Sequence, residues 1–388
     1  MTRLQCNVCG QPLGEPIFRS TASRGLTSLC EPSDTPASVW ACTTCGHLRG
    51  LALPDAAAYY ATGYRILLDH EDEDQIYEVD GERIVYRTEH QLRTLLGKLA
   101  LPPGAALLDY GCAKASTPRL LSKARADLAI HLFDVSEMYT AHWDAFVPID
   151  RRALHQTPGD WQARFDVVTS FFALEHIVEP VQTLRRIAAL LKLGGTLYGI
   201  VPNTFGNPAD FVVVDHVNHF TRASLAAAIH AAGLTVTEID AEAHRGALVF
   251  TALKAEPVNA GDGRDVADAL AGARRLGDFW SGFGDAVRKV EAETRGQRAA
   301  VYGSGFYGAY IATVLRDADG IECFLDRNPH RQGKTLFGKP VIAPEALSDD
   351  VGVLYVGLNP AIARSTVDSM PALQRSGRRI EVFAPVGR

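Results

Sequence analysis

The stretch from Leu107 to Asn203 constrains the fold more than any other part of the chain. Its first segment, Leu107–Ala115, is an apolar run that closes on an acid and a glycine, Asp109 and Gly111. Such a run predicts a strand that enters a tight turn and then a helix. A second apolar run ends in Asp134, 25 residues after Asp109. Because neighbouring strands of a βαβ unit end side by side, this carboxylate is placed to bind a pair of ribose hydroxyls.

Two further segments follow in order. Residues 165–172 are apolar and predict a buried strand that ends at Phe172, with His176 just beyond it. Residues 190–203 supply a helix end, a glycine turn and another strand, which ends at Asn203. Strand and helix patterns that alternate in this way predict an α/β fold with a parallel sheet.

The four segments, taken in this order, resemble a class I S-adenosylmethionine (SAM) methyltransferase. The first motif of that family is usually acid-x-Gly-x-Gly-x-Gly, and here Ala113 and Ala115 replace the second and third glycines. The resemblance implies that SAM binds across this turn. Its implied cofactor-binding residues are Asp109, Gly111, Ala113, Asp134 and Phe172. A degenerate fold that binds no SAM is the alternative.

The length of 388 residues predicts two or three domains. The net charge of −6 argues against a general nucleic-acid-binding surface. No apolar run approaches the roughly 20 residues that a membrane span needs, and the N-terminus lacks a signal-peptide core, so we expect a cytoplasmic protein. The expected parts are a zinc-binding module (1–50), a helical connector (51–104), a SAM-binding domain (105–255) and a helix plus a second Rossmann-like domain (256–388).

Four of the seven cysteines form two Cys-x-x-Cys pairs, and each pair is followed by a glycine. Such a pair resembles a zinc knuckle, and two knuckles complete a closed tetrahedral site, which is structural. An odd number of cysteines in paired spacing favours thiolate ligands over a disulfide framework. Two unrelated thiol pairs, or a redox motif, are the alternatives. The predicted zinc ligands are Cys6, Cys9, Cys42 and Cys45.

The connector contains a predicted helical stretch with Tyr59, Tyr60 and Tyr64, whose rings are either core or site residues. An acidic run at 69–74 is most simply a solvated face. A second helix is predicted over 82–99, because apolar and charged residues alternate there at helical spacing.

The densest group of titratable residues is Asp215, His216 and His219, in a loop beyond Asn203. We expect this loop to lie at the carboxyl edge of the sheet, where such a group is a candidate for catalysis. Histidines that only bridge or cap are an equally open interpretation. A helix is predicted over 222–232, with Thr221 as its N-cap.

The C-terminal part begins with a polar linker at 259–263 and a predicted helix over 265–294. A strand then opens into Gly-x-Gly-x-x-Gly, formed by Gly303, Gly305 and Gly308, and Asp326 ends the next strand. This is a dinucleotide fingerprint, and its helix N-terminus is able to bind the pyrophosphate of NAD or of a nucleoside-diphosphate sugar. A domain used only for packing is the third possibility.

A four-cysteine zinc module, a class I core and a second Rossmann-like domain together look like the sugar-nucleotide C-methyltransferases of deoxysugar pathways. In that family a His-Glu-His-x-x-Tyr-Phe segment lines the sugar pocket; here Asp215 and His216 stand for Glu-His, and His219 for the tyrosine. The resemblance implies a nucleoside-diphosphate sugar as substrate. Its implied binding residues are Asn203, Gly303, Gly305, Gly308 and Asp326.

The predicted reaction is SAM-dependent methylation of the carbon alpha to a keto group, by general-base catalysis. His216, beside Asp215, is the predicted base, and His176 and His219 are predicted to stabilise the enolate oxygen. Tyr60 or Tyr64 assists. O- or N-methylation of a polysaccharide precursor or small metabolite, NAD-dependent oxidation through the C-terminal glycines, and a non-catalytic scaffold are the alternatives. The sequence pattern favours no particular oligomeric state.

Overall fold

The computed structural model describes residues 4–66, 74–80, 83–255, 264–374 and 377–384. The chain folds into two compact units. The first comprises Met1–Leu13, Cys42–Asn207 and Val217–Ala269, and the second comprises Gly14–Ala41, Pro208–His216 and Leu270–Arg388. The predicted linker at 259–263, and the predicted acidic run apart from Asp74, lie outside the described residues.

The first unit is built on a seven-stranded sheet of order β10-β9-β8-β11-β12-β15-β14. The first five strands run parallel, and β15 and β14 are antiparallel to their neighbours. Long apolar runs suit the inner strands because both faces of a parallel sheet are covered. The strands are β8 (Ala106–Tyr110), β9 (Ala129–Asp134), β10 (Arg152–Leu154), β11 (Phe165–Phe171), β12 (Leu191–Pro202), β14 (Thr235–Asp240) and β15 (Ala247–Leu253).

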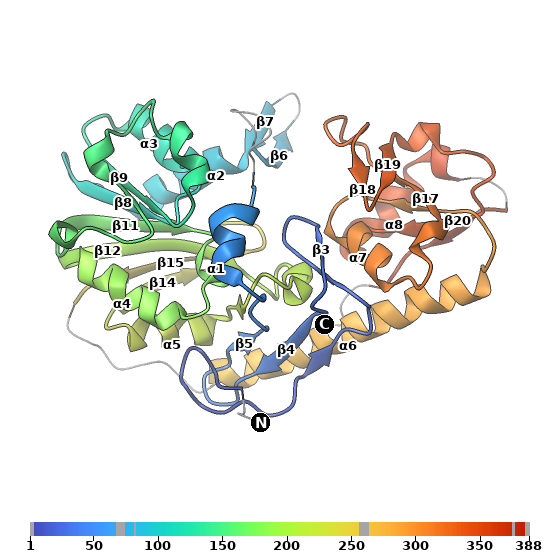
Figure 1. The fold of residues 1–388 in the computed structure, drawn as a ribbon, viewed down its shortest axis with the longest axis horizontal. Coiled ribbons are helices and arrows are strands. Elements are labelled where there is room, and N and C mark those ends of the chain that lie inside the picture. The colour runs from blue at the N-terminus through green and yellow to red at the C-terminus, as the bar shows by residue number, and fades with distance from the viewer. Residues whose placement is uncertain (1–3, 67–73, 81–82, 256–263, 375–376, 385–388) are drawn as a thin grey trace. The chain divides into compact units, whose positions relative to one another are not determined.

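Helices cover both faces of this sheet, α2 and α3 on one side and α4 and α5 on the other (Figure 1). Leu95, Leu107 and Trp143 belong to the core that these layers enclose. The predicted cap of α5 is confirmed, because the Ser224 amide donates to Thr221 Oγ1 over 3.1 Å. The helices are α2 (Arg87–Lys98), α3 (Ser116–Ala124), α4 (Pro180–Leu190) and α5 (Arg222–Ala231).

The segment that precedes the sheet is only partly helical. The short helix α1 (Ala56–Ala58) continues into one π-helical turn, Tyr59–Gly63. The prediction of a helix from residue 82 was wrong for its first turn, because β7 (Arg83–Tyr86) pairs with β6 (Ile76–Asp80) and the helix begins at Arg87. Ile, Val and Tyr in sequence favour an extended strand over a helix.

The second unit contains another Rossmann-like sheet, of order β18-β19-β17-β16-β20-β21. All its strands are parallel except β18. Its elements are β16 (Ala299–Tyr302), α7 (Phe306–Val314), β17 (Ile321–Leu325), β18 (Thr335–Leu336), β19 (Lys339–Ile342), β20 (Val353–Val356), α8 (Pro360–Asp368) and β21 (Arg379–Glu381). The predicted second α/β fold is confirmed.

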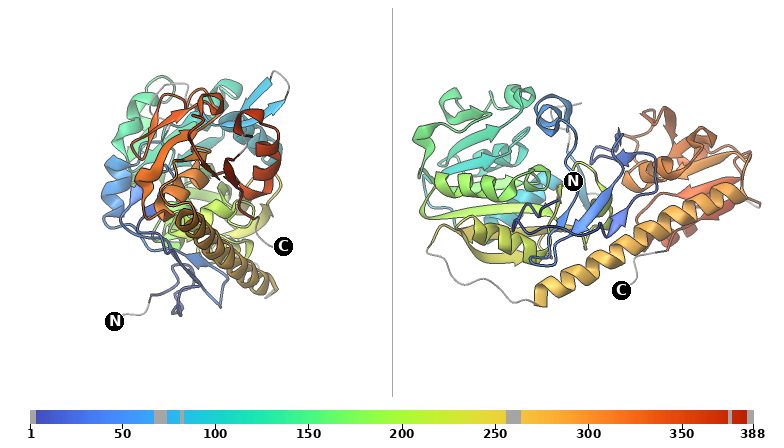
Figure 2. Two further views of the ribbon diagram at one scale, coloured as in Figure 1. Left: turned by 90° about the vertical axis from the view of Figure 1, so that its right-hand side faces the viewer. Right: turned by 60° about the horizontal axis from the view of Figure 1, so that its bottom comes forward.

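The remaining elements of this unit come from three parts of the chain. Strand β1 (Phe18–Arg19) pairs antiparallel with β4 (Ser38–Ala41), and the segment between them forms a small hairpin of β2 (Gly25–Leu26) with β3 (Pro32–Ser33). Figure 2 shows α6 (Arg264–Glu293), which belongs to this unit from Leu270 onward, as one continuous helix. Among the described residues, no helix combines the length and the apolar character that crossing a membrane requires.

Candidate functional site

The glycine turn after β8 keeps a left-handed backbone although it contains two alanines. Gly111, Ala113 and Ala115 have φ angles of 76°, 44° and 55°. This conformation costs an alanine about 1 kcal/mol, so the surrounding structure must hold it in place. One such contact comes from Trp143, whose indole N–H donates to the Ala113 carbonyl over 2.8 Å. The turn therefore keeps positive φ angles at the two positions where alanine replaces a glycine of the motif.

Asp134 joins the end of β9 to this turn. Its carboxylate accepts hydrogen bonds from the amides of Ala113 (2.7 Å) and Ser136 (2.9 Å), and the residue is only 7% exposed. A carboxylate has about four lone-pair directions, so these two bonds leave acceptor capacity. Beside a helix N-terminus, at the carboxyl edge of a parallel sheet, the turn and Asp134 fit the adenosyl ribose of SAM.

Asp109 lies beneath the turn and is 2% exposed. Burial raises the pKa of its carboxyl to about 7, although Thr169 donates a hydrogen bond over 2.7 Å that opposes the shift. The nearby Asp134 carboxylate raises the pKa further. The residue is thus a buried acid that titrates near neutrality.

Phe172 follows β11 directly and has a φ of 52°, which is rare for an aromatic residue. Its ring packs under the guanidinium of Arg87, 3.9 Å from the ring centroid. Arg87 also donates to Gln75 Oε1 over 2.8 Å. Arg87 belongs to no sequence motif, since one arginine at the start of a helix gives no signal of a functional site.

Three predicted site residues meet beyond β11. Tyr60 Oη lies 2.9 Å from His176 Nδ1, and the Tyr64 ring is 5.2 Å from the His176 ring. Tyr60 lies in the π-helical turn and Tyr64 directly follows it, and such turns are frequent at functional sites. The structure therefore gathers Tyr60, Tyr64 and His176 into one cluster.

Asn218 connects the loop that carries His176 to the two segments that contain the cysteines, at Asn7 and at His47. Its side-chain amide donates to the carbonyls of Leu174 (2.8 Å) and Ile177 (2.7 Å). Its Oδ1 accepts from Asn7 Nδ2 over 2.5 Å and lies 3.2 Å from His47 Nε2. An asparagine between histidines gave no signal in the sequence, yet it fixes the position of this loop.

His219 is next to Asn218 in β13 (Asn218–His219), which pairs with β5 (Leu48–Arg49). It is 1% exposed. The structure therefore places His219 beside Leu48, in the segment that follows Cys42 and Cys45.

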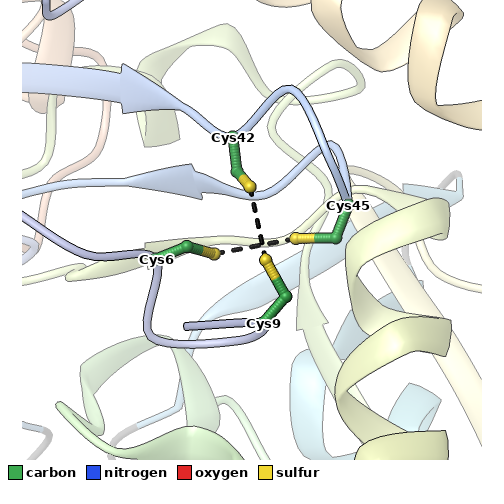
Figure 3. A group of neighbouring side chains, drawn as sticks. All are labelled: Cys6, Cys9, Cys42 and Cys45. Atoms are coloured by element: carbon green, nitrogen blue, oxygen red, sulfur yellow. Dashed lines mark hydrogen bonds between the residues drawn. The ribbon is translucent and has the colours of Figure 1, made fainter. Parts of the chain in front are cut away.

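The four predicted zinc ligands come together (Figure 3). Their sulfur atoms lie within 4.8 Å of one another, at 3.6 Å for Cys6 and Cys45 and 3.4 Å for Cys9 and Cys42. Tetrahedral zinc with Zn–S bonds of about 2.3 Å would separate its sulfurs by about 3.8 Å. The cluster is therefore suited to a closed metal site.

The acid of the His216 pair is not the one that the sequence indicated. His216 Nδ1 lies 2.6 Å from Asp210 Oδ1, and Asp210 is 1% exposed. Asp215 instead accepts from the backbone amide and the hydroxyl of Ser28, both over 2.7 Å. A short helical turn, Pro208–Val212, presents the earlier acid to the histidine, which adjacency in sequence did not reveal.

Two of the three C-terminal glycines, Gly303 and Gly308, serve close packing. A Cβ on Gly308 would meet the Gly303 carbonyl oxygen at 1.8 Å, whereas a Cβ on Gly305 would meet nothing within 4 Å. Asp326 accepts from the Ser304 hydroxyl over 2.5 Å and from its amide over 3.2 Å. In the first unit, Asn203 follows β12 directly, and its backbone amide donates to the Gly246 carbonyl over 3.0 Å.

Residues 84–239 match the family model described as a methyltransferase domain. The chain is 30% identical over 113 residues to a ubiquinone biosynthesis O-methyltransferase of Xanthomonas campestris pv. campestris, covering 28% of this chain and 47% of that protein. It is 32% identical over 102 residues to the protein of that name from Xanthomonas axonopodis pv. citri, covering 25% and 43%. The chain thus spans about half the length of the curated relatives it matches.

A SAM-dependent methyltransferase structure from Mesorhizobium loti aligns with 42% of this chain and 97% of its own, at 17% identity and a TM-score of 0.35. The family match covers β8 to β12 and the turn described above. The chain therefore contains a class I SAM-dependent methyltransferase domain.

Proposed function

We propose that this protein methylates a nucleotide-linked keto-deoxysugar, with SAM as donor, on the carbon alpha to the keto group. The observation that carries the methyltransferase part is the turn at Gly111 with Asp134 bonded to it, inside a matched methyltransferase domain. The acceptor class is supported by the combination of this domain with a four-cysteine cluster and a second Rossmann-like sheet.

Asp134 and the backbone of the glycine turn would hold SAM, which supplies an electrophilic methyl group on a sulfonium. Positioning of the acceptor carbon then contributes much of the rate acceleration. The four cysteines would hold one zinc ion, and because they fill all four positions the ion is structural. Through Asn218, this module would help to position the loop that carries His176.

Two histidines are candidates for the base that removes the alpha proton. His216 is favoured, since the Asp210 carboxylate bonded to Nδ1 keeps a proton there and leaves Nε2 as the basic nitrogen. His176 is the second candidate, with Tyr60 as its partner. Both arrangements fix the orientation of an imidazole, which proton transfer requires.

O-methylation is a second candidate function, favoured by the names of the relatives that match the methyltransferase domain. It requires deprotonation of a hydroxyl and no enolate. The two reactions therefore differ in whether the protein exchanges a carbon-bound proton of the acceptor.

The test is deuterium exchange in D₂O, with S-adenosylhomocysteine and a panel of nucleoside-diphosphate keto-deoxysugars, read by mass spectrometry and NMR. We expect deuterium at the alpha carbon of the sugar that the enzyme methylates. His216→Asn should slow both exchange and methylation by about 10²–10⁴-fold while SAM affinity stays unchanged. A methylated product without any exchange would instead establish O-methylation. Normal rates in both His216→Asn and His176→Asn would refute the role of these histidines.

Metal analysis tests the zinc assignment. We expect about one zinc per chain, and a loss of metal in Cys6→Ser and Cys45→Ser. Cys30→Ser is the matched control, because Cys30 is outside the four-cysteine cluster and should keep its metal content. Less than about half an equivalent in the unaltered protein would contradict the assignment.

A further inference from the structure

The turn between β14 and β15 lies at the carboxyl edge of the methyltransferase sheet. Strand β15 runs antiparallel to β12, and Ala247 at its start pairs with Pro202 at the end of β12. The Gly246 carbonyl accepts from the Asn203 amide over 3.0 Å. Ligands of open α/β sheets bind at this edge. The turn therefore contributes side chains to the region where the reaction is expected.

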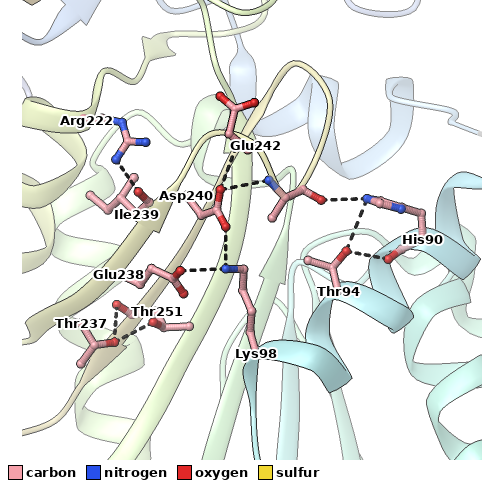
Figure 4. Close-up of polar contacts among 11 residues, drawn as sticks. His90, Thr94, Lys98, Arg222, Thr237, Glu238, Ile239, Asp240, Glu242 and Thr251 are labelled. Carbon is pink, nitrogen blue, oxygen red and sulfur yellow. Dashed lines mark hydrogen bonds and ion pairs between the residues drawn. The ribbon is translucent and has the colours of Figure 1, made fainter.

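This turn is held by neighbours on several sides. His90 Nε2 donates to the Ala243 carbonyl over 2.9 Å, as drawn in Figure 4. The Arg245 amide donates to Tyr77 Oη over 2.8 Å. Asp240, which is paired with a lysine of α2, accepts from the Ala243 amide over 3.0 Å (Figure 4). A side chain between these anchors is preorganised, as a binding residue needs to be.

His244 is that side chain, and it is 4% exposed. Its ring meets the rings of Tyr77, His90 and Phe172 edge-on, at 5.0, 5.2 and 5.5 Å. Phe172 is the residue that follows the strand at the predicted cofactor site. The His244 ring thus borders that site at Phe172 only, and it is enclosed by aromatic groups.

One nitrogen of His244 is an unused hydrogen-bond acceptor. Nδ1 lies 3.2 Å from the Arg245 carbonyl, which only accepts, so Nδ1 carries the proton and Nε2 the lone pair. Burial, with the Arg87 charge nearby, lowers the pKa of His244 to about 4, which keeps the ring neutral. Within the described part of the chain, no group hydrogen-bonds to the buried Nε2 atom. Leaving such an atom unsatisfied is costly, and a ligand that donates to it would remove the cost.

We propose that His244 is a binding residue for the methyl acceptor, whose hydroxyl group donates a hydrogen bond to Nε2. The proposal rests on the proposed methyltransferase function and specifies how this edge of the site recognises its substrate. A lone pair selects an O–H or N–H donor and rejects an anion. A sugar ring supplies such hydroxyls next to the carbon that is methylated.

The position of His244 favours the acceptor over SAM as the donor of this hydrogen bond. The glycine turn and Asp134 follow β8 and β9, whereas His244 precedes β15. Strands β11 and β12 separate β8 from β15, which places three strand spacings of about 4.8 Å each between them. His244 therefore lies at least three strand spacings away from the turn and Asp134, which would hold SAM, although its ring borders Phe172.

His131 provides a matched comparison within the same sheet. It too is buried, with Nδ1 3.0 Å from a backbone carbonyl and no partner for Nε2 among the described residues. However, it lies inside β9 and packs against Trp161 and Phe165, the residue that begins β11. A buried histidine with a protonated Nδ1 and an unpartnered Nε2 thus lies at the ligand edge, as His244, and also away from it, as His131.

Steady-state kinetics test the proposal, with the keto-deoxysugar of the panel that the wild type methylates fastest. Asparagine keeps a group in place of Nδ1 and removes the Nε2 acceptor, whereas glutamine places its amide oxygen near the Nε2 position. We expect His244→Asn to raise the KM of the sugar by about three- to tenfold, with the KM of SAM and kcat little changed. His244→Gln should restore most of the affinity. His131→Asn should leave the KM of the sugar unchanged.

Several outcomes would overturn the assignment: an unchanged KM for the sugar in folded His244→Asn, an effect on the KM of SAM instead, or an equal effect in His131→Asn. If the variants do not fold, wild-type protein labelled with ¹⁵N-histidine decides. The unprotonated Nε2 resonance should move upfield when the sugar is added to the S-adenosylhomocysteine complex. A resonance that moves with S-adenosylhomocysteine alone, or never, overturns the proposal.

Failure of the wild type to bind SAM would refute the methyltransferase proposal itself, before any variant is made.

Discussion

The two Rossmann-like sheets of this protein solve the same local problem with different residues. In each, the strand that leads into the glycine turn ends in Tyr-Gly, at Gly111 in one sheet and Gly303 in the other. In each, an acid at the end of the neighbouring strand or directly after it accepts a hydrogen bond from an amide of that turn: Asp134 from Ala113, and Asp326 from Ser304. A shared architecture therefore makes an acid at this position part of the turn, whether or not a ligand follows.

The two glycine turns differ in features that distinguish a packing requirement from a ligand site. Gly308 has no room for a side chain because the Gly303 carbonyl lies against it, so close packing alone is enough to require glycine at this position. The methyltransferase turn, in contrast, holds two alanines in a left-handed conformation. It also has the buried carboxyl of Asp109 where the second sheet has Val301, which is fully buried. Strain and a buried acid cost stability, which indicates that the first turn is kept for a ligand.

The largest expected effect is on the packing of the second sheet. Gly308→Ala should lower the free energy of unfolding by about 3–5 kcal/mol, since its Cβ would overlap a backbone oxygen that cannot move aside freely. Gly305→Ala is the control and should be nearly neutral, because the space beside it is open. Urea denaturation of both variants measures the difference. Equal stabilities would show that this fingerprint is not a packing requirement.

Asp109 should make stability depend on pH in a way that its counterpart Val301 cannot. Its folded pKa of about 7 lies above the ordinary value of 3.8, so the folded state holds the proton more tightly. Stability is therefore lost as the pH rises from about 4 to about 7, and no further loss follows above that. Asp109→Asn should remove this dependence and stabilise the protein at pH 8 by about 2–4 kcal/mol. Thermal unfolding from pH 4 to pH 8 tests this, and parallel curves for the two proteins would contradict it.

Six strands of the two sheets were predictable from sequence as apolar runs: β8, β9, β11, β12, β16 and β17. Local propensity also predicted the cap at Thr221, and the Cys-x-x-Cys spacing predicted the four-cysteine cluster. The start of α2 was misjudged, since Ile84 to Tyr86 pair with the preceding strand and a helical periodicity does not report such pairing. A sequence pattern therefore predicts the local conformation of a segment better than it predicts which other segment pairs with it.

The same limit applies to the candidate site. Asp215 was the expected partner of His216 because it is adjacent, but a turn supplies Asp210 instead. Asn218, Arg87 and His244 belong to no motif, and their roles arise from contacts with residues far away in sequence. Residues of the types that bind metals or nucleotides were therefore predictable from the sequence. The residues that orient those side chains were not.

Asp134 and Asp326 should differ in their contribution to SAM affinity. Asp134→Ala should weaken SAM binding by about 1–3 kcal/mol, since a charge-assisted bond to the ribose is lost. Asp134→Asn should cost less, because an amide oxygen still accepts one hydrogen bond. Asp326→Ala should leave SAM affinity unchanged, although Asp326 makes the same kind of bond to its own turn. Titration calorimetry of the three variants measures the affinities. If Asp134→Ala bound SAM normally, the acid would serve the turn alone in both sheets, and the ligand would have to be held elsewhere along the carboxyl edge.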